Sequence, residues 1–260
     1  MTSSSDGLAA VAMYPFDAAR AALDELWPMV RRHLGFGPAE LTWTLDLHSS
    51  WRMDHLLLGQ TCGWPLVSQL GEAVEVVGVF DATVPEAHDG TYRSVIISRS
   101  AQSLAAQLTD PSLRLAVNND DSLSGYISLR TVCADHGRSV DSPLFTGAHL
   151  ESVRAVAAGA ADLASIDAVS WALIGDADPD LVGDLHVVGY GPRVPCLPLI
   201  CAVGLPPVDG MPVVSHLRRA LGAACATVEA QPLLAALHAR GFVEKTPADY
   251  APLRVLSGAL

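Results

Sequence analysis

Apolar and polar positions along the first hundred residues follow two periods, one typical of strands and one of helices. Short apolar runs at 8–13, 74–80 and 93–98 predict buried strands. Between Phe16 and Leu34 the apolar residues recur at helical spacing, and Gly35 suits the C-terminal cap of that helix. Strands separated by helical stretches indicate an α/β fold with a largely parallel sheet.

A further strand is expected over residues 41–47, where apolar and polar residues alternate. The strand–helix pattern then restarts in the middle of the chain. It predicts strands at 113–117, 163–166 and 185–188 and helices at 124–134 and 150–160. A strand at 197–203 and helices at 214–226 and 232–239 close the chain. The middle of the sequence therefore forms a small α/β unit of its own.

Composition and charge narrow the class of ligand. The 260 residues are 50% hydrophobic and 17% charged, which is enough apolar content for two folded lobes. The sequence has no apolar stretch that is long enough and free enough of charge to predict a membrane-spanning helix. The net charge of −12 argues against nucleic acid as a partner, since a duplex binder needs a basic face. A small anion stays possible, because backbone amides at a helix start hold anions without Lys or Arg.

Five cysteines are present, Cys62, Cys133, Cys196, Cys201 and Cys225, and no two have C-x-x-C spacing. The odd number and the spacing predict buried thiols, with neither a disulfide framework nor a metal site. No P-loop, G-x-S-x-G or H-E-x-x-H motif occurs, so no cofactor is predicted and no catalytic motif is found.

The amino-terminal stretch lacks a basic segment followed by a sustained apolar run before Asp17. We therefore expect a cytoplasmic protein, or a periplasmic one if a signal was removed.

One segment predicts a seat for an oxyanion, that is, a place where hydrogen-bond donors converge. After the strand ending at Val117, polar residues lead into a helix that starts near Ser124. The first N–H groups of a helix have no internal partner and carry partial positive charge. Ser122 and Ser124 add hydroxyl donors, and Gly125 lets an anion approach the backbone. The alternative is an ordinary serine N-cap.

Three segments resemble the phosphate, phosphite and phosphonate substrate-binding proteins of ABC importers: 117–126, 146–149 with 158–167, and 58–66. These proteins belong to the type 2 periplasmic-binding-protein superfamily. The resemblance implies two α/β lobes, two crossing segments and a ligand cleft between the lobes. The implied crossings lie near 98–103 and 190–198. Lobe one would then comprise residues 1–99 and 195–260, and lobe two residues 100–194.

The resemblance also implies the residues that contact the ligand. The candidates are Tyr14, Gln60, Thr61, Cys62, Trp64, Tyr92, Ser122, Leu123, Ser124, Gly125, His149 and Asp167. Leu123 stands where the family usually has Thr, and Ala148 where it often has Ser, so two hydroxyl donors are lost. Asp167 either faces the ligand at the end of its strand or caps the helix that follows.

The predicted function is binding of a small phosphorus oxyanion or organophosphonate, without catalysis, by a monomer. An ABC permease is the implied partner. One alternative is an enzyme on the same fold, resembling the menaquinone-pathway dehydratases, with Asp167 or His149 as acid or base. Another is a sensor, or a binder of a thiamine-precursor-like heterocycle that stacks on Trp64 and Tyr92.

Overall fold

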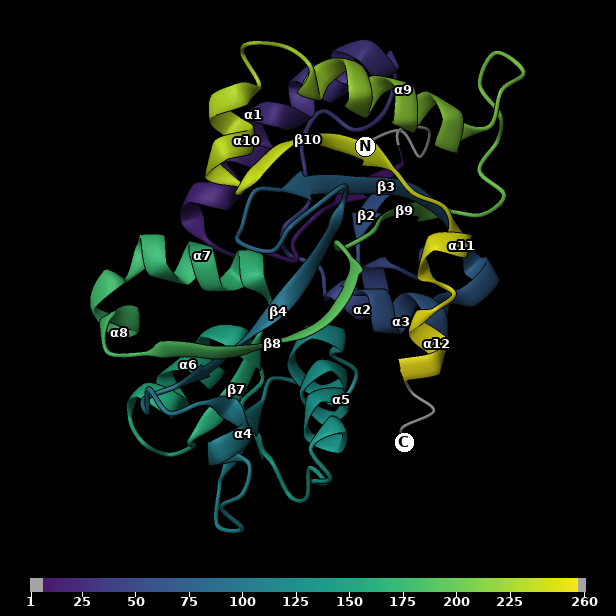
Figure 1. Cartoon of the computed structure of the whole chain (residues 1–260). Coiled ribbons are helices and arrows are strands. Elements are labelled where there is room, and N and C mark those ends of the chain that lie inside the picture. The colour runs from purple at the N-terminus through teal and green to yellow at the C-terminus, as the bar shows by residue number, and fades with distance from the viewer. Residues whose placement is uncertain (1–6, 257–260) are drawn as a thin grey trace. The chain divides into compact units, whose positions relative to one another are not determined.

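A computed structural model describes residues 7–256, so residues 1–6 and 257–260 of the expected first lobe lie outside the described residues. The described chain divides into two compact units, each built around one five-stranded sheet (Figure 1). Of the described residues, the first unit holds those from 7 to 83, Ala87–Thr91 and Pro195–Pro252. The second holds Val84–Glu86, Tyr92–Val194 and Leu253–Leu256.

The sheet of the first unit has the strand order β1-β2-β9-β3-β10. Its strands are β1 (Leu8–Ala10), β2 (Leu56–Gln60), β3 (Val74–Ala82), β9 (Leu199–Ala202) and β10 (Ala239–Glu244). β2 and β9 are buried along their whole length, because helices and loops cover both faces of the central strands.

Helices α1 (Asp17–Leu34) and α9 (Val213–Cys225) pack against each other on this sheet (Figure 1). α1 ends where Gly35 takes a left-handed conformation with φ 84°, as the sequence predicts. The remaining segments are α2 (Leu47–Ser50), α3 (Gly63–Pro65), the π-helical turn η1 (Leu66–Leu70), the 3₁₀ turn η2 (Gly71–Ala73), α10 (Gln231–Ala236) and α11 (Pro247–Tyr250).

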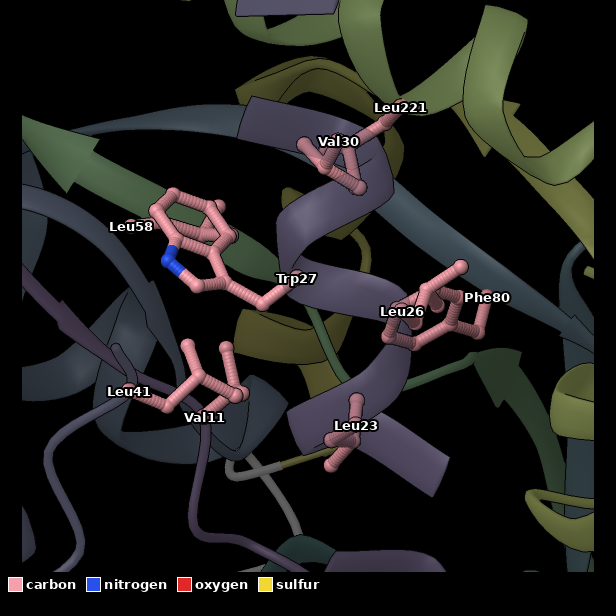
Figure 2. A pocket seen from close by; sticks show the side chains of 9 residues that line it. All are labelled: Val11, Leu23, Leu26, Trp27, Val30, Leu41, Leu58, Phe80 and Leu221. Carbon is pink, nitrogen blue, oxygen red and sulfur yellow. The ribbon is translucent and has the colours of Figure 1, made fainter. Parts of the chain in front are cut away.

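A small apolar cavity of about 20 Å³ lies beside α1 (Figure 2). It is lined by Val11, Leu23, Leu26, Trp27, Val30, Leu41, Leu58, Phe80 and Leu221. These side chains offer an anion no hydrogen bond within the cavity, because the one polar group among them, the indole N–H of Trp27, donates to the Pro38 carbonyl at 2.9 Å. The cavity is therefore a packing gap in the core of the first unit, and we do not consider it a ligand site.

The sheet of the second unit has the strand order β6-β5-β7-β4-β8. Its strands are β4 (Thr91–Ser98), β5 (Leu115–Val117), β6 (Leu144–Phe145), β7 (Leu163–Ile166) and β8 (His186–Pro195). Its helical segments are α4 (Leu104–Gln107), the π-helical turn η3 (Leu123–Ile127), α5 (Ser128–Asp135), α6 (His149–Ala157), α7 (Ala168–Ala177) and α8 (Pro179–Gly183). Ile96, Leu129 and Leu163 are fully buried in its core. The last helix, α12 (Leu253–Leu256), is grouped with this unit.

The predicted largely parallel sheet is wrong, because both sheets are mixed. β9 is antiparallel to β2 and β3, β10 to β3, and β4 to β7. The parallel pairs are β1 with β2, β5 with β6 and β5 with β7. In each parallel pair the chain between the strands contains a helix, the kind of crossover that parallel strands need.

The predicted strand over 41–47 is also wrong. The Asp46 side chain accepts a hydrogen bond from the Ser49 backbone N–H at 2.9 Å and starts α2 instead. Leu45 is exposed, and Trp43 donates from its indole nitrogen to Asp24 at 2.8 Å. The alternating residues therefore do not face a common core.

The second unit begins earlier than the expected lobe boundary at residue 100. β4 pairs with β7, with Val95 opposite Ile166, so this strand belongs to the second sheet. The chain consequently passes between the units within Thr83–Tyr92, not at 98–103. The return at Val194–Pro195 lies within the expected second crossing. That the two units act as lobes which close around a ligand stays a prediction.

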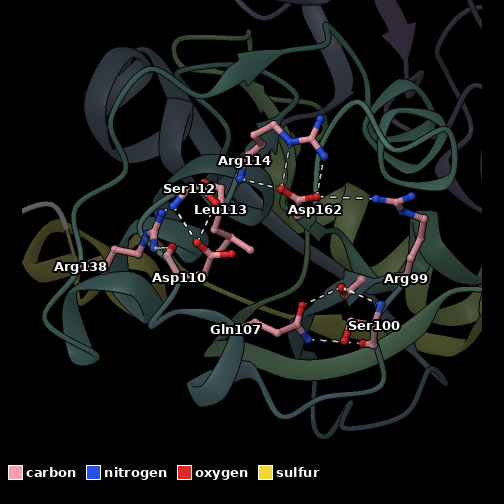
Figure 3. A network of polar contacts seen from close by, with 10 residues as sticks. Arg99, Ser100, Gln107, Asp110, Ser112, Leu113, Arg114, Arg138 and Asp162 are labelled. Carbon is pink, nitrogen blue, oxygen red and sulfur yellow. Dashed lines mark hydrogen bonds and ion pairs between the residues drawn. The ribbon is translucent and has the colours of Figure 1, made fainter.

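Hydrogen bonds and ion pairs connect the turns that precede β5 and β7, at the amino ends of these strands (Figure 3). The Asp162 carboxylate accepts hydrogen bonds from the backbone N–H and the guanidinium of Arg114, at 2.6–3.0 Å. Arg99 approaches the same carboxylate at 3.6 Å. Nearby, Arg138 donates to the backbone carbonyls of Asp110 and Leu113. This network closes the end of the sheet opposite to the predicted seat.

All five cysteines are buried thiols, as predicted. Burial raises the pKa of Cys133 to about 11 and those of Cys201 and Cys225 to about 12. Within residues 7–256, no helix is both long and apolar enough to cross a bilayer.

Candidate functional site

The predicted seat lies at one edge of the second sheet. The parallel strands β5, β6 and β7 are in register, with Ala116 opposite both Leu144 and Ala164. The segments that follow these strands therefore leave the sheet at the same edge. In open α/β sheets this carboxyl edge is where ligands bind.

The segment after β5 starts a helix, as the sequence predicts. Ser122 is the N-cap residue, and its hydroxyl oxygen accepts a hydrogen bond from the Gly125 N–H at 3.0 Å. The Leu123 side chain is only 2% exposed and packs in the core. Ser124, also buried, has its backbone carbonyl held by the Ser165 hydroxyl at 2.6 Å. The serine cap that the sequence analysis held as an alternative is thus present.

The structure joins Ser124 to His149, the first residue of α6. The Ser124 Oγ and the His149 Nε2 lie 2.9 Å apart, within hydrogen-bond distance. Ala148, the N-cap residue of α6, makes no side-chain cap bond to the first turn. Two helix starts and two side-chain hydrogen-bonding groups therefore meet at this edge, and groups of this kind can bind an oxyanion.

Burial of the His149 imidazole favours its neutral form. Burial lowers its pKa below the ordinary value, and the negative charge of Asp167 acts in the opposite direction. The Nδ1 atom is buried and has no hydrogen-bond partner within the described part of the chain. A proton added to the ring would leave a buried N–H without an acceptor.

Asp167 and Tyr92 form a second buried pair at this edge. The Tyr92 hydroxyl donates to Asp167 Oδ2 at 2.6 Å, and Asp167 Oδ1 accepts from the Ser170 N–H at 2.8 Å. Asp167 is therefore the N-cap of α7, one of the two roles left open by the sequence. Its contact with a ligand stays a prediction, as does that of Tyr92.

Close packing against Asn118 requires glycine at position 125, and the sequence did not predict this contact. A β-carbon there would collide with the side-chain oxygen of Asn118, a buried atom for which residues 7–256 supply no hydrogen-bond partner. The space around Gly125 is thus filled by Asn118, and the Gly125 N–H is used by Ser122. Asn118 and Ser165 were not predicted as site residues. A serine inside the apolar run Leu163–Ile166 was the available signal for Ser165.

The other predicted residues lie in the first unit. Thr61 is fully buried, and its N–H donates to the Pro198 carbonyl at 3.0 Å. Gln60 ends β2, and its backbone carbonyl accepts from the indole of Trp51 at 2.8 Å. Cys62 is the N-cap residue of α3, and Trp64 is a half-buried residue within it.

Tyr14 is half-buried in the segment after β1. β1 and β2 are parallel neighbours, so Tyr14 and Gln60–Trp64 follow the same edge of the first sheet. The ligand contacts of these first-unit residues stay predictions.

Within residues 7–256, no three side chains of His, Cys, Asp or Glu gather closely enough to hold a metal ion.

Solved structures of binding proteins resemble this fold along almost the whole chain. PhnD1 from Prochlorococcus marinus MIT 9301, in complex with methylphosphonate, is 15% identical with a TM-score of 0.76, covering 96% of each chain. A binding component of an ABC phosphonate transporter from Pseudomonas aeruginosa is 18% identical with a TM-score of 0.74, over 97% of this chain and 86% of that one. A Xanthomonas citri protein bound to ATP is 20% identical with a TM-score of 0.67, over 97% and 95%. At these identities the likeness establishes the two-lobed periplasmic-binding-protein fold.

A comparison of the amino-acid sequence with family profiles identifies the family. No curated protein sequence matches the chain. The profile of one family, described as ABC transporter, phosphonate, periplasmic substrate-binding protein, matches residues 57–250. That match spans most of the chain and covers β2 through α11, including the predicted seat. The enzyme alternative has no comparable support. The chain belongs to the family of phosphonate substrate-binding proteins of ABC transporters.

Proposed function

We propose that this chain binds the oxyanion of a phosphonate, or of a closely related phosphorus oxyanion, at the seat formed by Ser122–Gly125 and His149. The observation that carries the proposal is the 2.9 Å contact between Ser124 Oγ and His149 Nε2. It joins hydrogen-bonding groups from the starts of two helical segments that leave one sheet edge. A bound oxygen would accept hydrogen bonds from these groups and from the backbone N–H groups beside them.

The two hydroxyl donors lost relative to the family pattern affect this proposal unequally. Leu123 is buried in the core, so its side chain supports packing at the seat and donates nothing. Ala148 is exposed just before α6, where it leaves the first turn without a side-chain cap. We infer that backbone N–H groups of α6 take the place of the missing serine hydroxyl.

Membership of the family supports a proposal for the partner and the compartment. We infer that the chain works as a monomer in the periplasm and delivers its ligand to an ABC permease. A cytoplasmic location, expected from the amino-terminal sequence, has no support from the family.

A binding panel tests the proposal. Calorimetry and thermal shift would compare methylphosphonate, aminoethylphosphonate, phosphite, phosphate and sulfate. A ligand at about a hundred times its dissociation constant stabilises the fold by about 2.7 kcal/mol. We expect at least one phosphorus oxyanion to do so with wild type and to bind more weakly to Ser124→Ala. Ser215→Ala, at an exposed serine of α9, is the control and should bind as wild type does. If none of the five anions binds, the proposal fails.

A further inference from the structure

His149 brings an imidazole to the seat, a side chain whose charge ordinarily changes near neutral pH. It lies at the start of α6, where a positive side chain meets the positive end of the helix dipole. Its Nδ1 has no acceptor, and its Nε2 faces the Ser124 hydroxyl. Without ligand, the positive end of the helix and the lack of an acceptor at Nδ1 both disfavour a second proton on the ring, whereas the Ser124 hydroxyl can donate to Nε2 or accept from it.

Charged groups also lie on α6 itself and on the elements that contact it, which include β7, α7 and α8. Asp167, after β7, is the carboxylate that acts on it electrostatically. Glu151 and Arg154, on its own helix, pair with each other at 2.6 Å and are exposed. Asp176 of α7 and Asp180 of α8 are exposed as well. Among the described residues 7–256, the charged group that acts on the imidazole is Asp167, and no Lys or Arg does so.

In this arrangement the two negative charges of a bound dianion would not be compensated by positive charge. Hydrogen-bond donors at the seat are neutral, and the charge that acts on His149 is already negative. A ligand with two negative charges would be buried beside Asp167 without a cation, which costs free energy unless a charge is neutralised. His149 is the group placed to supply that positive charge.

We infer that the seat binds its oxyanion together with one proton, which His149 takes up when the ligand arrives as a dianion. The inference rests on the proposed function and adds the charge state of the bound pair. In the balanced step, one proton moves from solvent to the imidazole, and the ligand keeps both negative charges. The pair then carries one net negative charge. A ligand that already has a single charge, such as a phosphonate monoester, binds without that proton.

The sign of the pH dependence follows. Ligand binding raises the pKa of His149, which burial holds below its ordinary value in the free protein. Affinity for a dianion therefore rises as pH falls from the pKa of the bound form towards that of the free form. One proton taken up corresponds to up to about tenfold in affinity per pH unit over this window. Below the pKa of the free form the affinity no longer depends on this proton.

Calorimetry in two buffers of different ionisation enthalpy measures the proton directly. Methylphosphonate above its second pKa is the dianionic probe, and its monomethyl ester is the singly charged probe. We expect wild type to take up close to one proton with methylphosphonate and none with the ester. His149→Gln keeps a hydrogen-bonding side chain and should lose the uptake. Ser124→Ala, which retains the imidazole, should bind more weakly but keep the uptake.

Nitrogen NMR of the histidine side chains gives a second readout that needs no substitution at the site. The His149 ring should change from the neutral to the doubly protonated form when methylphosphonate is added to wild type. Binding without proton uptake, or equal uptake by wild type and His149→Gln, would overturn the inference and leave the proposed function intact. Failure of both probes to bind would remove the inference together with phosphonate binding.

Discussion

The side-chain oxygen of Asn118 lies where a β-carbon on residue 125 would stand, so Gly125 is the residue that lets the two segments meet. Asn118 follows β5 directly, and Gly125 lies in the first turn of η3. Their contact sets how the helix start approaches the end of the strand. The geometry of the seat therefore depends on a glycine for reasons of packing, in addition to any approach of a ligand.

Gly125→Ala should disturb this contact. The methyl group must push Asn118 or the turn aside, and overpacking of this kind typically costs about 1–3 kcal/mol. We expect a lower free energy of unfolding in denaturant and weaker ligand binding. Gly222→Ala is the matched control, because nothing lies within 4 Å of the added carbon and position 222 is inside α9. That change should leave stability equal or higher, by up to about 1 kcal/mol. Equal stability of Gly125→Ala and wild type would show that Asn118 moves without cost.

Ser124→Ala should weaken binding by about tenfold or more. A hydrogen bond to a charged group contributes about 1.5–3 kcal/mol, and the Ser124 hydroxyl lies at the proposed seat, 2.9 Å from His149 Nε2. Titration calorimetry with the best ligand of the panel measures the loss. Ser122→Ala tests the role of the helix cap, because the Ser122 hydroxyl oxygen accepts a hydrogen bond from the Gly125 N–H. It should lower the unfolding free energy by about 1 kcal/mol. An unchanged dissociation constant for Ser124→Ala would place the anion elsewhere.

Two substitutions distinguish the roles of Asp167. Tyr92→Phe removes a 2.6 Å donor to a carboxylate that is 2% exposed. We expect it to destabilise the protein by about 1–3 kcal/mol. Asp167→Asn keeps a good cap for α7. If Asp167 also faces the ligand, Asp167→Asn should relax discrimination against sulfate, because an amide can donate to it. Equal rejection of sulfate by wild type and Asp167→Asn, in competition calorimetry, would restrict Asp167 to its structural role.

The sequence predicted those parts of the fold whose apolar pattern has a single explanation. The helix up to Leu34 with its Gly35 cap, and the strand at 163–166, are confirmed. β2 was missed, because a strand buried on both faces shows no alternation. The false strand at 41–47 had alternation, but its Asp46 starts a helix. Strand direction was also misjudged, since the pattern of a strand does not record which way its neighbour runs.

The seat was predicted from local chemistry, and its long-range contacts were not. Ser122 and Ser124 were identified because a helix start follows a strand end, which is a short-range signal. The Ser124–His149 pair joins residues 25 apart, and Tyr92–Asp167 joins residues 75 apart. Contacts over these separations depend on the register of β4, β5 and β7, which the apolar pattern leaves open.

The buried cysteines should resist modification in the native state. The thiolate is the reactive form, and burial raises the pKa of Cys133 to about 11 and that of Cys201 to about 12. At neutral pH, labelling by a thiol reagent should therefore be slow for folded protein and complete in denaturant. The difference in rate is measured by absorbance. Fast labelling of either residue in the folded state, located by peptide mass analysis, would contradict its burial.

Asp162 should stabilise the protein above pH 4 and cease to do so in acid. Hydrogen bonds from the Arg114 side chain hold the pKa of the Asp162 carboxyl below its ordinary value. The unfolded carboxyl has a pKa of about 3.9, so the stabilisation is fully present above that pH. It is lost as pH falls through the lower pKa of the folded state.

A variant of Asp162 and a control variant allow the pH dependence of this stabilisation to be measured. Asp162→Asn should lower the free energy of unfolding by about 1 kcal/mol at neutral pH, a modest value because the carboxylate is 27% exposed. The difference from wild type should shrink as pH falls towards 3, because protonation of Asp162 then removes the same charge. Asp209→Asn, at an exposed turn of the first unit, is the control and should follow wild type across the range. Urea unfolding at several pH values gives the comparison. A constant difference between Asp162→Asn and wild type would mean that Asp162 acts through its shape at the turn and its charge contributes nothing.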